Sequence, residues 1–325
     1  MESILNNIFS ATPHSFEALT LDIFRYQYKD NAVYRNWINA LGTNVNSVSS
    51  MVDLPFLPVS FFKDHNVVTD SFAPEQVFES SGTTGTLNSR HLVKDSAVYT
   101  RSFTKGFELF YGNPAEWCII GLLPAYLERK GSSLVAMVDE LIRLSGHEQS
   151  GFYLYNFSEL AEVIKHLEAA GQKTLLIGVT FALLDFAEQF PMQLNHTIVM
   201  ETGGMKGRRK EMIRPEVHSF LQQQFGSNAI HSEYGMTELL SQAYSNGQGI
   251  FKTVPWMKIL VRDEDDPLQV NTQGKGLINV IDFANIHSCS FIATDDAGTL
   301  HQDGQFEVMG RSDYSDLRGC SLLYL

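Results

Sequence analysis

The sequence predicts an α/β protein with a smaller, β-rich region toward its C-terminal side. Between about residues 117 and 232, short apolar segments alternate with amphipathic ones, which favours a largely parallel sheet covered by helices. From about residue 250 the apolar segments are short and separated by turns, with no long helical pattern between them, which indicates a mainly antiparallel region. The chain has 325 residues, enough for more than one ordinary domain.

Apolar spacing predicts each element in order. The first helix is expected to begin after Ser15, whose hydroxyl could cap it. Strands are then expected at 117–123, 174–179, 197–200 and 229–232, and helices at 132–144, from 158 onward, at 180–190 and at 215–225. The strands expected after residue 250 are 251–261, 274–283, 288–293 and 305–309.

These elements divide the chain into four predicted regions. The first two are α/β subdomains, each carrying one polar motif described below, and the third is the β-rich module. The last is a short hinge-like tail. Their boundaries are 1–175, 176–249, 250–309 and 310–325.

Composition excludes several classes of protein. The net charge is −13 and no basic stripe occurs, so a nucleic-acid partner is not expected. The longest apolar stretch, 118–127, is too short to span a bilayer and contains Pro124. Three cysteines without a CxxC pair argue against a disulfide framework, and the first residues do not form a signal peptide. A cytoplasmic location is therefore expected.

The sharpest motif is a hydroxyl-rich loop. Two glycines frame two threonines, and two serines precede them. Such a loop can direct several backbone N–H groups at one anion, and its hydroxyls add further donors. It is not a Walker loop, because no GxxxxGK[ST] pattern occurs. The sequence predicts a phosphate site here, with a polar surface turn as the alternative, at Ser80, Ser81, Gly82, Thr83, Thr84 and Gly85.

A second motif follows a predicted strand, where α/β sheets commonly bind ligands. In it a tyrosine can stack on a base, a threonine hydroxyl can reach a phosphate, and a glutamate can hold Mg²⁺. The alternative is an ordinary helix start. The residues concerned are Tyr234, Gly235, Thr237 and Glu238.

Two charged segments lie farther along the chain. An Asp-rich turn is predicted at 294–298, and a carboxylate there could accept both hydroxyls of a ribose, although most such turns have no such role. Segment 310–313 is expected to place a cation and a carboxylate after the last strand.

Together these motifs resemble those of the adenylate-forming superfamily, which comprises acyl-CoA synthetases, peptide-synthetase adenylation domains and luciferases. Segment 81–85 matches the phosphate loop of that superfamily, and 234–238 matches its tyrosine-glycine-x-threonine-glutamate motif. Segment 294–298 resembles its threonine-glycine-aspartate motif, with Asp295 where glycine is usual, and 310–313 matches its glycine-arginine-x-aspartate hinge. The four occur in the order of the family. Within the superfamily the chain most resembles the acyl-protein synthetases of bacterial bioluminescence fatty-acid reductase complexes, through segments 57–63, 123–129, 203–208 and 317–321.

The resemblance implies the large-domain fold of that superfamily and activation of a carboxylic acid, expected to be a fatty acid, as acyl-AMP with release of pyrophosphate. It implies ATP and Mg²⁺ as cofactors. The roles that it implies are Ser80 to Gly85 on the β- and γ-phosphates, Thr237 on the α-phosphate, Glu238 on Mg²⁺, Tyr234 with Gly203 and Gly204 around adenine, and Asp296 with Arg311 on the ribose.

The resemblance also implies transfer of the acyl group to a cysteine near the C-terminus. Cys320 is the candidate, and the neighbouring Arg318 would favour its thiolate. The alternative for Cys320 is a small buried residue. Cys118 and Cys289 fall in predicted strands and are expected in the core.

The chain departs from the superfamily in two respects. The lysine that follows the phosphate loop is missing, and Arg90 or Lys94 could replace it. The C-terminal domain that carries a catalytic lysine is absent from this sequence. Three functions remain open: an enzyme that acylates itself or a partner protein, a ligase that acylates coenzyme A or a carrier protein, and a nucleotide-binding protein without catalysis.

Overall fold

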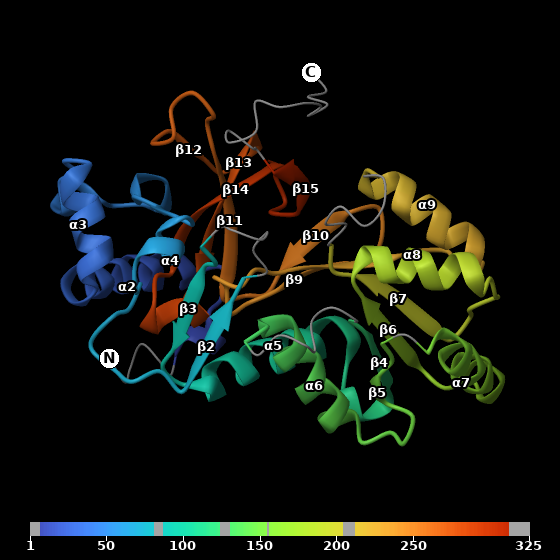
Figure 1. The fold of residues 1–325 in the computed structure, drawn as a ribbon. Coiled ribbons are helices and arrows are strands. Elements are labelled where there is room, and N and C mark those ends of the chain that lie inside the picture. Colours follow the sequence, from blue (N-terminus) through green and yellow to red (C-terminus); the bar gives the residue numbers. More distant parts are fainter. Residues whose placement is uncertain (1–6, 81–86, 124–130, 155, 204–211, 312–325) are drawn as a thin grey trace.

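The computed structural model describes residues 7–80, 87–123, 131–154, 156–203 and 212–311. One mixed sheet runs through this part of the chain, and helices pack on both of its faces (Figure 1). The α-helices are α2 (Phe16–Asp30), α3 (Ala32–Ala40), α4 (Phe61–Asp64), α5 (Ser96–Tyr111), α6 (Ser133–Ser145), α7 (Phe157–Ala170), α8 (Thr180–Gln189) and α9 (Arg214–Phe225). Short 3-10 helices are η1 (Ile8–Ser10), η2 (Val45–Ser47), η3 (Met51–Asp53), η4 (Pro114–Glu116) and η5 (Phe283–His287).

The large sheet has a parallel half and an antiparallel half. The parallel half contains β5 (Gly151–Phe152), β4 (Cys118–Leu122), β6 (Thr174–Gly178), β7 (Thr197–Glu201) and β8 (His231–Tyr234), in that spatial order. The sheet continues antiparallel through β9 (Ala243–Ser245), β10 (Ile250–Thr253), β15 (Phe306–Arg311), β14 (Phe291–Leu300), β13 (Gly274–Asp282), β11 (Met257–Arg262) and β12 (Val270–Asn271). Three further strands are β1 (Leu57–Pro58), which pairs with β14, and the separate hairpin of β2 (Gln76–Glu79) and β3 (Arg90–Val93).

Burial on both faces of the sheet explains why the parallel strands have continuous apolar sequences. Every residue of β4 and of β6 is buried, as expected for strands with helices on both faces. In Figure 1, α5 and α6 lie to the left of these strands, and α8 and α9 lie above them. The predicted α/β fold with an added antiparallel region is confirmed.

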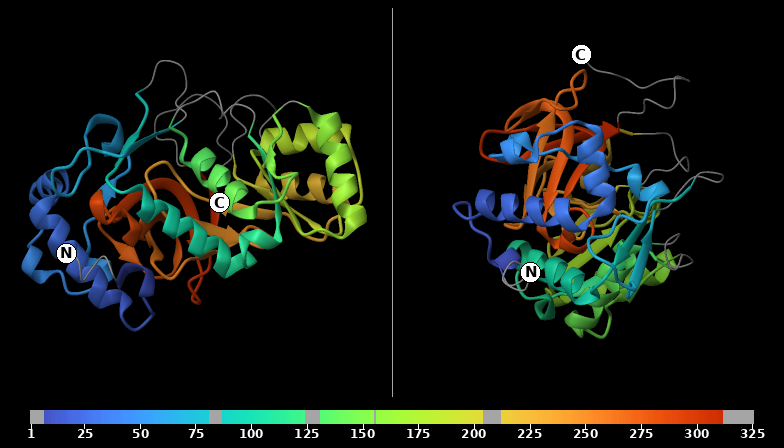
Figure 2. Two further views of the ribbon diagram at one scale, coloured as in Figure 1. Left: turned by 90° about the horizontal axis from the view of Figure 1, so that it is seen from below. Right: turned by 90° about the vertical axis from the view of Figure 1, so that its left-hand side faces the viewer.

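The N-terminal helices pack on the antiparallel half, and Figure 2 shows the blue helices beside the orange strands. Phe16 of α2 stacks on Phe283 with ring centroids 4.3 Å apart. The Gln27 side chain donates to the carbonyls of Asn285 and Ile286 and accepts from Ser290 N. Helix α2 and the segment around η5 therefore share one core.

Several element boundaries differ from the sequence prediction. Helix α7 begins at Phe157 because the Asn156 side chain caps it, rather than at residue 158. The strand expected at 251–261 is two strands, because Pro255 has no N–H to give to a ladder. The Ser15 side chain makes no capping hydrogen bond to α2, and α5 was not predicted at all.

None of the helices in the described segments is long and apolar enough to cross a bilayer.

Candidate active site at the junction of the two sheet halves

The tyrosine motif lies where the sheet changes from parallel to antiparallel. Tyr234 ends β8, and the chain then forms a turn before β9, which pairs antiparallel with β8. Residues 235–241, called the acidic turn below, therefore sit beyond the carboxyl end of a strand at a change in sheet topology, where α/β proteins bind ligands. Gly235 is exposed at the start of this turn.

Three of the predicted nucleotide residues converge here from three strands. The Tyr234 hydroxyl donates a 2.8 Å hydrogen bond to Asp296 Oδ2, and Arg311 Nε lies 3.6 Å from Asp296 Oδ1. Asp296 stands directly opposite Arg311 in the β14–β15 ladder. Burial raises the pKa of Asp296, although the Tyr234 hydrogen bond and the Arg311 charge oppose that shift.

Two predictions about the secondary structure of these residues are wrong. Segment 294–298 is not a turn, because it lies inside β14. Arg311 does not follow the last strand but ends it. A strand position holds Asp296 against its neighbours more firmly than a turn would, because the ladder on each side fixes the backbone.

Glu238 is the buried carboxylate of the acidic turn, with a relative exposure of 5%. Burial raises its pKa, and the neighbouring Ser89 side chain opposes that shift. Ser89 in turn pairs with Ser80: Ser80 N donates to Ser89 O at 3.0 Å, and Ser89 N donates to Ser80 Oγ at 2.9 Å. Ser80, the first residue of the hydroxyl-rich loop, is thus paired with a residue that interacts with Glu238.

Two buried side chains form hydrogen bonds with the backbone of the acidic turn. Asn285 Nδ2 donates to the Glu238 carbonyl at 2.7 Å, and Asn285 Oδ1 accepts from Leu240 N at 3.0 Å. The Asp282 carboxylate accepts from the N–H groups of Leu240 and Ser241 and from the Ser241 hydroxyl. Burial raises the pKa of Asp282 to about 6, against these hydrogen bonds.

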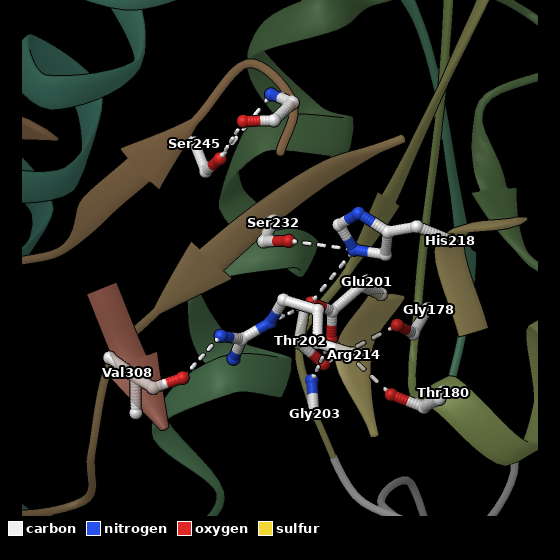
Figure 3. Close-up of polar contacts among 11 residues, drawn as sticks. Gly178, Thr180, Glu201, Thr202, Gly203, Arg214, His218, Ser232, Ser245 and Val308 are labelled. Carbon is white, nitrogen blue, oxygen red and sulfur yellow. Dashed lines mark hydrogen bonds and ion pairs between the residues drawn. The ribbon is translucent and has the colours of Figure 1, made fainter. Parts of the chain in front are cut away.

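A second polar network surrounds Glu201 at the end of β7 (Figure 3). Its carboxylate accepts from Gly203 N at 2.7 Å and from Arg214 Nε at 3.1 Å, and His218 Nε2 lies 3.5 Å away. Burial alone would raise the pKa of Glu201, but the His218 hydrogen bond and the Arg214 charge lower it to about 2. Arg214 Nη1 also donates to the Val308 carbonyl of β15 at 2.8 Å.

This network orients the start of the predicted adenine loop. Gly203 has a φ of +74°, a left-handed conformation that favours glycine, and its N–H is fixed by Glu201. Because Arg214 bonds to both Glu201 and β15, the network also links this loop to the strand that carries Arg311. The sequence analysis missed Glu201, which had no motif to mark it.

Glu233 is another functional candidate that the sequence analysis missed. It stands opposite Tyr244 in the β8–β9 ladder, on the face of β8 away from Tyr234. Burial and the charge of Glu201 raise the pKa of Glu233 to about 8. The buried Tyr244 hydroxyl has no hydrogen-bond partner among the described residues. On the same strand as Glu233, His231 Nδ1 shares a 3.2 Å hydrogen bond with the Tyr111 hydroxyl.

The remaining residues predicted for the site differ in their exposure and contacts. Thr237 is partly buried in the acidic turn. Arg90 is exposed, and Lys94 lies over the Phe72 ring, 5.6 Å from its centroid. Cys118 and Cys289 are buried, as expected. The residues that lie outside the described segments are Ser81, Gly82, Thr83, Thr84, Gly85, Gly204 and Cys320.

Solved structures share this architecture at low sequence identity. ATP-bound MatB from Rhodopseudomonas palustris aligns with a TM-score of 0.55 and 16% identity, over 74% of this chain and 49% of that one. An open conformation of 2-hydroxyisobutyryl-CoA ligase, in complex with 2-HIB-AMP and CoA, aligns with a TM-score of 0.61 and 12% identity, over 94% and 72%. The luciferase-like enzyme from the mealworm Zophobas morio aligns with a TM-score of 0.50 and 16% identity, over 75% and 59%.

The common architecture is that of the adenylate-forming proteins, and the chain has this fold. It spans about half the length of MatB. The family described as acyl-protein synthetase, LuxE, matches residues 10–324, and the chain belongs to that family. No curated protein matches the sequence.

Proposed function

We propose that this protein activates a carboxylic acid with ATP, forming an acyl-adenylate and pyrophosphate, and then transfers the acyl group to a thiol. One observation carries the proposal. Ser80, the first residue of the hydroxyl-rich loop, pairs with Ser89, and His91 Nδ1, two residues on, lies 3.0 Å from the Thr237 carbonyl oxygen of the acidic turn. This contact supports the proposal that the phosphate-binding loop and the candidate metal ligand, far apart in the sequence, belong to one site. Membership of the acyl-protein synthetase family supports the same reaction.

The reaction requires two substrates to be aligned and their charges to be balanced. A carboxylate oxygen of the acid attacks the α-phosphorus of ATP, and the bond from that phosphorus to the bridging oxygen of the β-phosphate breaks. Asp296, fixed by Tyr234 and Arg311, would hold the ribose hydroxyls. Thr237 would donate to the α-phosphate, and the Gly203 and Gly204 backbone would flank adenine beside Tyr234.

Glu238 fits the role of a Mg²⁺ ligand. Its raised pKa marks a buried carboxylate that lacks a cationic partner at contact distance among the described residues, which a divalent cation would supply. Mg²⁺ is commonly held by one or two carboxylates together with substrate phosphates. When bound, the cation would offset negative charge on the phosphates.

The second step transfers the acyl group to a thiol. A thiolate attacks the acyl carbonyl, the bond from that carbon to the AMP oxygen breaks, and AMP leaves. Cys320 is the proposed acceptor. Cys118 and Cys289 are poor candidates, because both are buried and burial raises the pKa of each thiol.

Acid-dependent exchange of labelled pyrophosphate into ATP tests the first step. The panel should run from acetate to hexadecanoate and include aromatic acids, with fatty acids as the first expected substrates. Exchange that requires both an acid and Mg²⁺ is the expected result. If every acid in the panel fails, the activation step is wrong, and a nucleotide-binding protein becomes the better description.

Labelled acid then distinguishes the acceptors. A hydroxylamine-sensitive label on the protein indicates self-acylation, whereas a soluble labelled thioester formed with coenzyme A indicates a ligase. Label on an added carrier protein indicates transfer to a partner.

A further inference from the structure

The backbone carbonyl of Glu238 has a buried side-chain partner. Asn285 Nδ2, from helix η5, donates to this oxygen at 2.7 Å. The N–H group of the same peptide, which belongs to Leu239, donates to the Met236 carbonyl at 3.1 Å. The peptide group that joins Glu238 to Leu239 is therefore held at both of its polar atoms. Its orientation sets ψ, one of the two soft backbone torsion angles of Glu238.

The preceding peptide group is held as well. His91 Nδ1 lies 3.0 Å from the Thr237 carbonyl oxygen, and this oxygen can only accept, so the ring donates to it. The two peptide groups that flank the Cα atom of Glu238 are thus each bonded to a buried side chain from a distant part of the sequence. Because these two groups define φ and ψ of Glu238, they also set the direction in which its side chain leaves the backbone.

The amide of Asn285 is fully used and its orientation is fixed. Nδ2 donates to the carbonyls of Glu238 and Cys289, at 2.7 and 3.1 Å, and Oδ1 accepts from Leu240 N at 3.0 Å. Since a carbonyl oxygen can only accept and a backbone N–H can only donate, these partners decide which amide atom is the nitrogen. Asn285 is fully buried, so water does not compete for these bonds.

Helix η5 is itself held on two sides. Asp282 Oδ1 accepts from Ala284 N at 3.0 Å and so caps the start of the helix. Gln27 Nε2, from helix α2, donates to the Asn285 carbonyl at 3.1 Å. Asp282 and Gln27 are both fully buried. The amide that contacts Glu238 is therefore carried by a part of the core that is fixed independently of the acidic turn.

We propose that Asn285 is a positioning residue for Glu238, the candidate metal ligand. By holding the Glu238 carbonyl, Asn285 keeps the backbone of this residue in one conformation before Mg²⁺·ATP binds, so that binding does not have to order it. The inference rests on the proposed function and deepens it, since Glu238 is a metal ligand only under that proposal. The competing explanation is that Asn285 stabilises the fold and has no effect on the site.

Asn31 provides a matched control, because its amide makes the same kinds of contact in another place. Asn31 Nδ2 donates to the Ser288 carbonyl at 2.8 Å, and Oδ1 accepts from Tyr34 N at 2.9 Å. Asn31 is also fully buried. Among the described residues, none of its side-chain hydrogen bonds reaches the acidic turn. Asn31→Ala therefore removes comparable buried bonds without touching Glu238.

Calorimetric titration of the full chain with ATP, at a series of Mg²⁺ concentrations, compares the variants. Asn285→Ala should need about tenfold more Mg²⁺ for half-maximal ATP affinity, because loss of a group that orients a metal ligand commonly weakens metal binding by at least that factor. Asn31→Ala should keep the Mg²⁺ dependence of the wild type. Thermal midpoints measured in parallel should fall in both variants, since each leaves buried backbone groups unpaired.

A double variant shows whether Asn285 acts through Glu238. In a Glu238→Gln background, Asn285→Ala should change the Mg²⁺ dependence little further, because the carboxylate that it positions is already gone. A full additional tenfold shift in the double variant would mean that Asn285 acts on the site by another route, and would overturn the inference.

Two further outcomes would overturn it. One is an Asn285→Ala protein that keeps the Mg²⁺ dependence of the wild type, and the other is an equal shift in Asn285→Ala and Asn31→Ala. If Asn285→Ala does not fold, Asn285→Ser replaces it in the same comparison, and an unchanged Mg²⁺ dependence there is equally decisive.

The result is separable from that of the proposed function, because the titration requires no acid. If exchange fails with every acid while Mg²⁺·ATP still binds, the activation proposal fails and the comparison of Asn285 with Asn31 still decides this inference. If ATP binding by the wild type does not respond to Mg²⁺, there is no metal ligand to position, and the inference is overturned.

Discussion

The Tyr234 hydroxyl donates a 2.8 Å hydrogen bond to Asp296 Oδ2, across 62 positions of sequence. This bond joins the last parallel strand, β8, to β14 of the antiparallel half, and Arg311 reaches the same carboxylate from β15. This polar contact therefore links the two halves of the sheet, and the predicted ribose site lies on it.

Removal of the Tyr234 hydroxyl should weaken nucleotide binding. Tyr234→Phe leaves the Asp296 carboxylate with one partner fewer in a buried position, a loss of about 1–3 kcal/mol. We expect the KM for ATP in pyrophosphate exchange to rise about tenfold or more, with a smaller change in kcat. Tyr244→Phe is the matched control, because its hydroxyl has no partner among the described residues and its loss should leave this KM unchanged.

Replacement of Glu238 should separate catalysis from folding. Glu238→Ala removes the proposed Mg²⁺ ligand, so exchange should fall below detection. The thermal midpoint should change little, because loss of a buried carboxylate whose pKa is raised by burial also removes a desolvation cost. Exchange at the wild-type rate in this variant would exclude Glu238 from metal binding.

Replacement of Cys320 should affect only the second step. Cys320→Ala should keep acid-dependent exchange and lose the hydroxylamine-sensitive label from radioactive acid. Cys118→Ala, which changes a buried cysteine of β4, should keep both. Label that persists in the Cys320 variant would mean that another residue accepts the acyl group.

The Glu201 network should make stability sensitive to acid. The pKa of Glu201 is lowered to about 2, so its ionised form stabilises the fold above the ordinary pKa of a glutamate. That contribution is lost as the pH falls from about 4.5 toward 2. Glu201→Gln should therefore be less stable than the wild type at pH 7, by about 3 kcal/mol, and the difference should shrink below pH 4. Urea unfolding at pH 7, 5 and 3.5 measures it, and a constant difference would contradict the assignment.

Glu233 should produce the opposite dependence on pH. Its pKa is raised to about 8, so the neutral carboxyl is the form that the fold favours. The contribution to stability is complete below pH 4.5 and is lost as the pH rises through about 8. Between pH 5 and 9 the wild type should lose thermal stability relative to Glu233→Gln. Parallel curves for the two proteins would show that Glu233 ionises normally.

Local sequence patterns predicted most of the elements but not their ends. Helix α8 and strand β7 lie within one residue of the predicted segments, because their apolar periodicity and flanking polar residues are local signals. Segment 294–298 was assigned to a turn on its aspartates, whereas pairing with β13 and β15 makes it strand. Composition cannot reveal such pairing, because the partner strand lies elsewhere in the sequence.

The hydroxyl-rich loop, the tyrosine-to-glutamate motif and the α/β alternation could be read from the sequence, because each is a pattern of neighbouring residues. The side chains that support the acidic turn and the Gly203 backbone became evident only in the folded protein. Asn285 and Glu238 are 47 positions apart, and neither Asn285 nor Glu201 belongs to a motif. Their roles arise because folding brings them to buried polar groups that need partners, and a requirement of that kind exists only once the chain has closed around it.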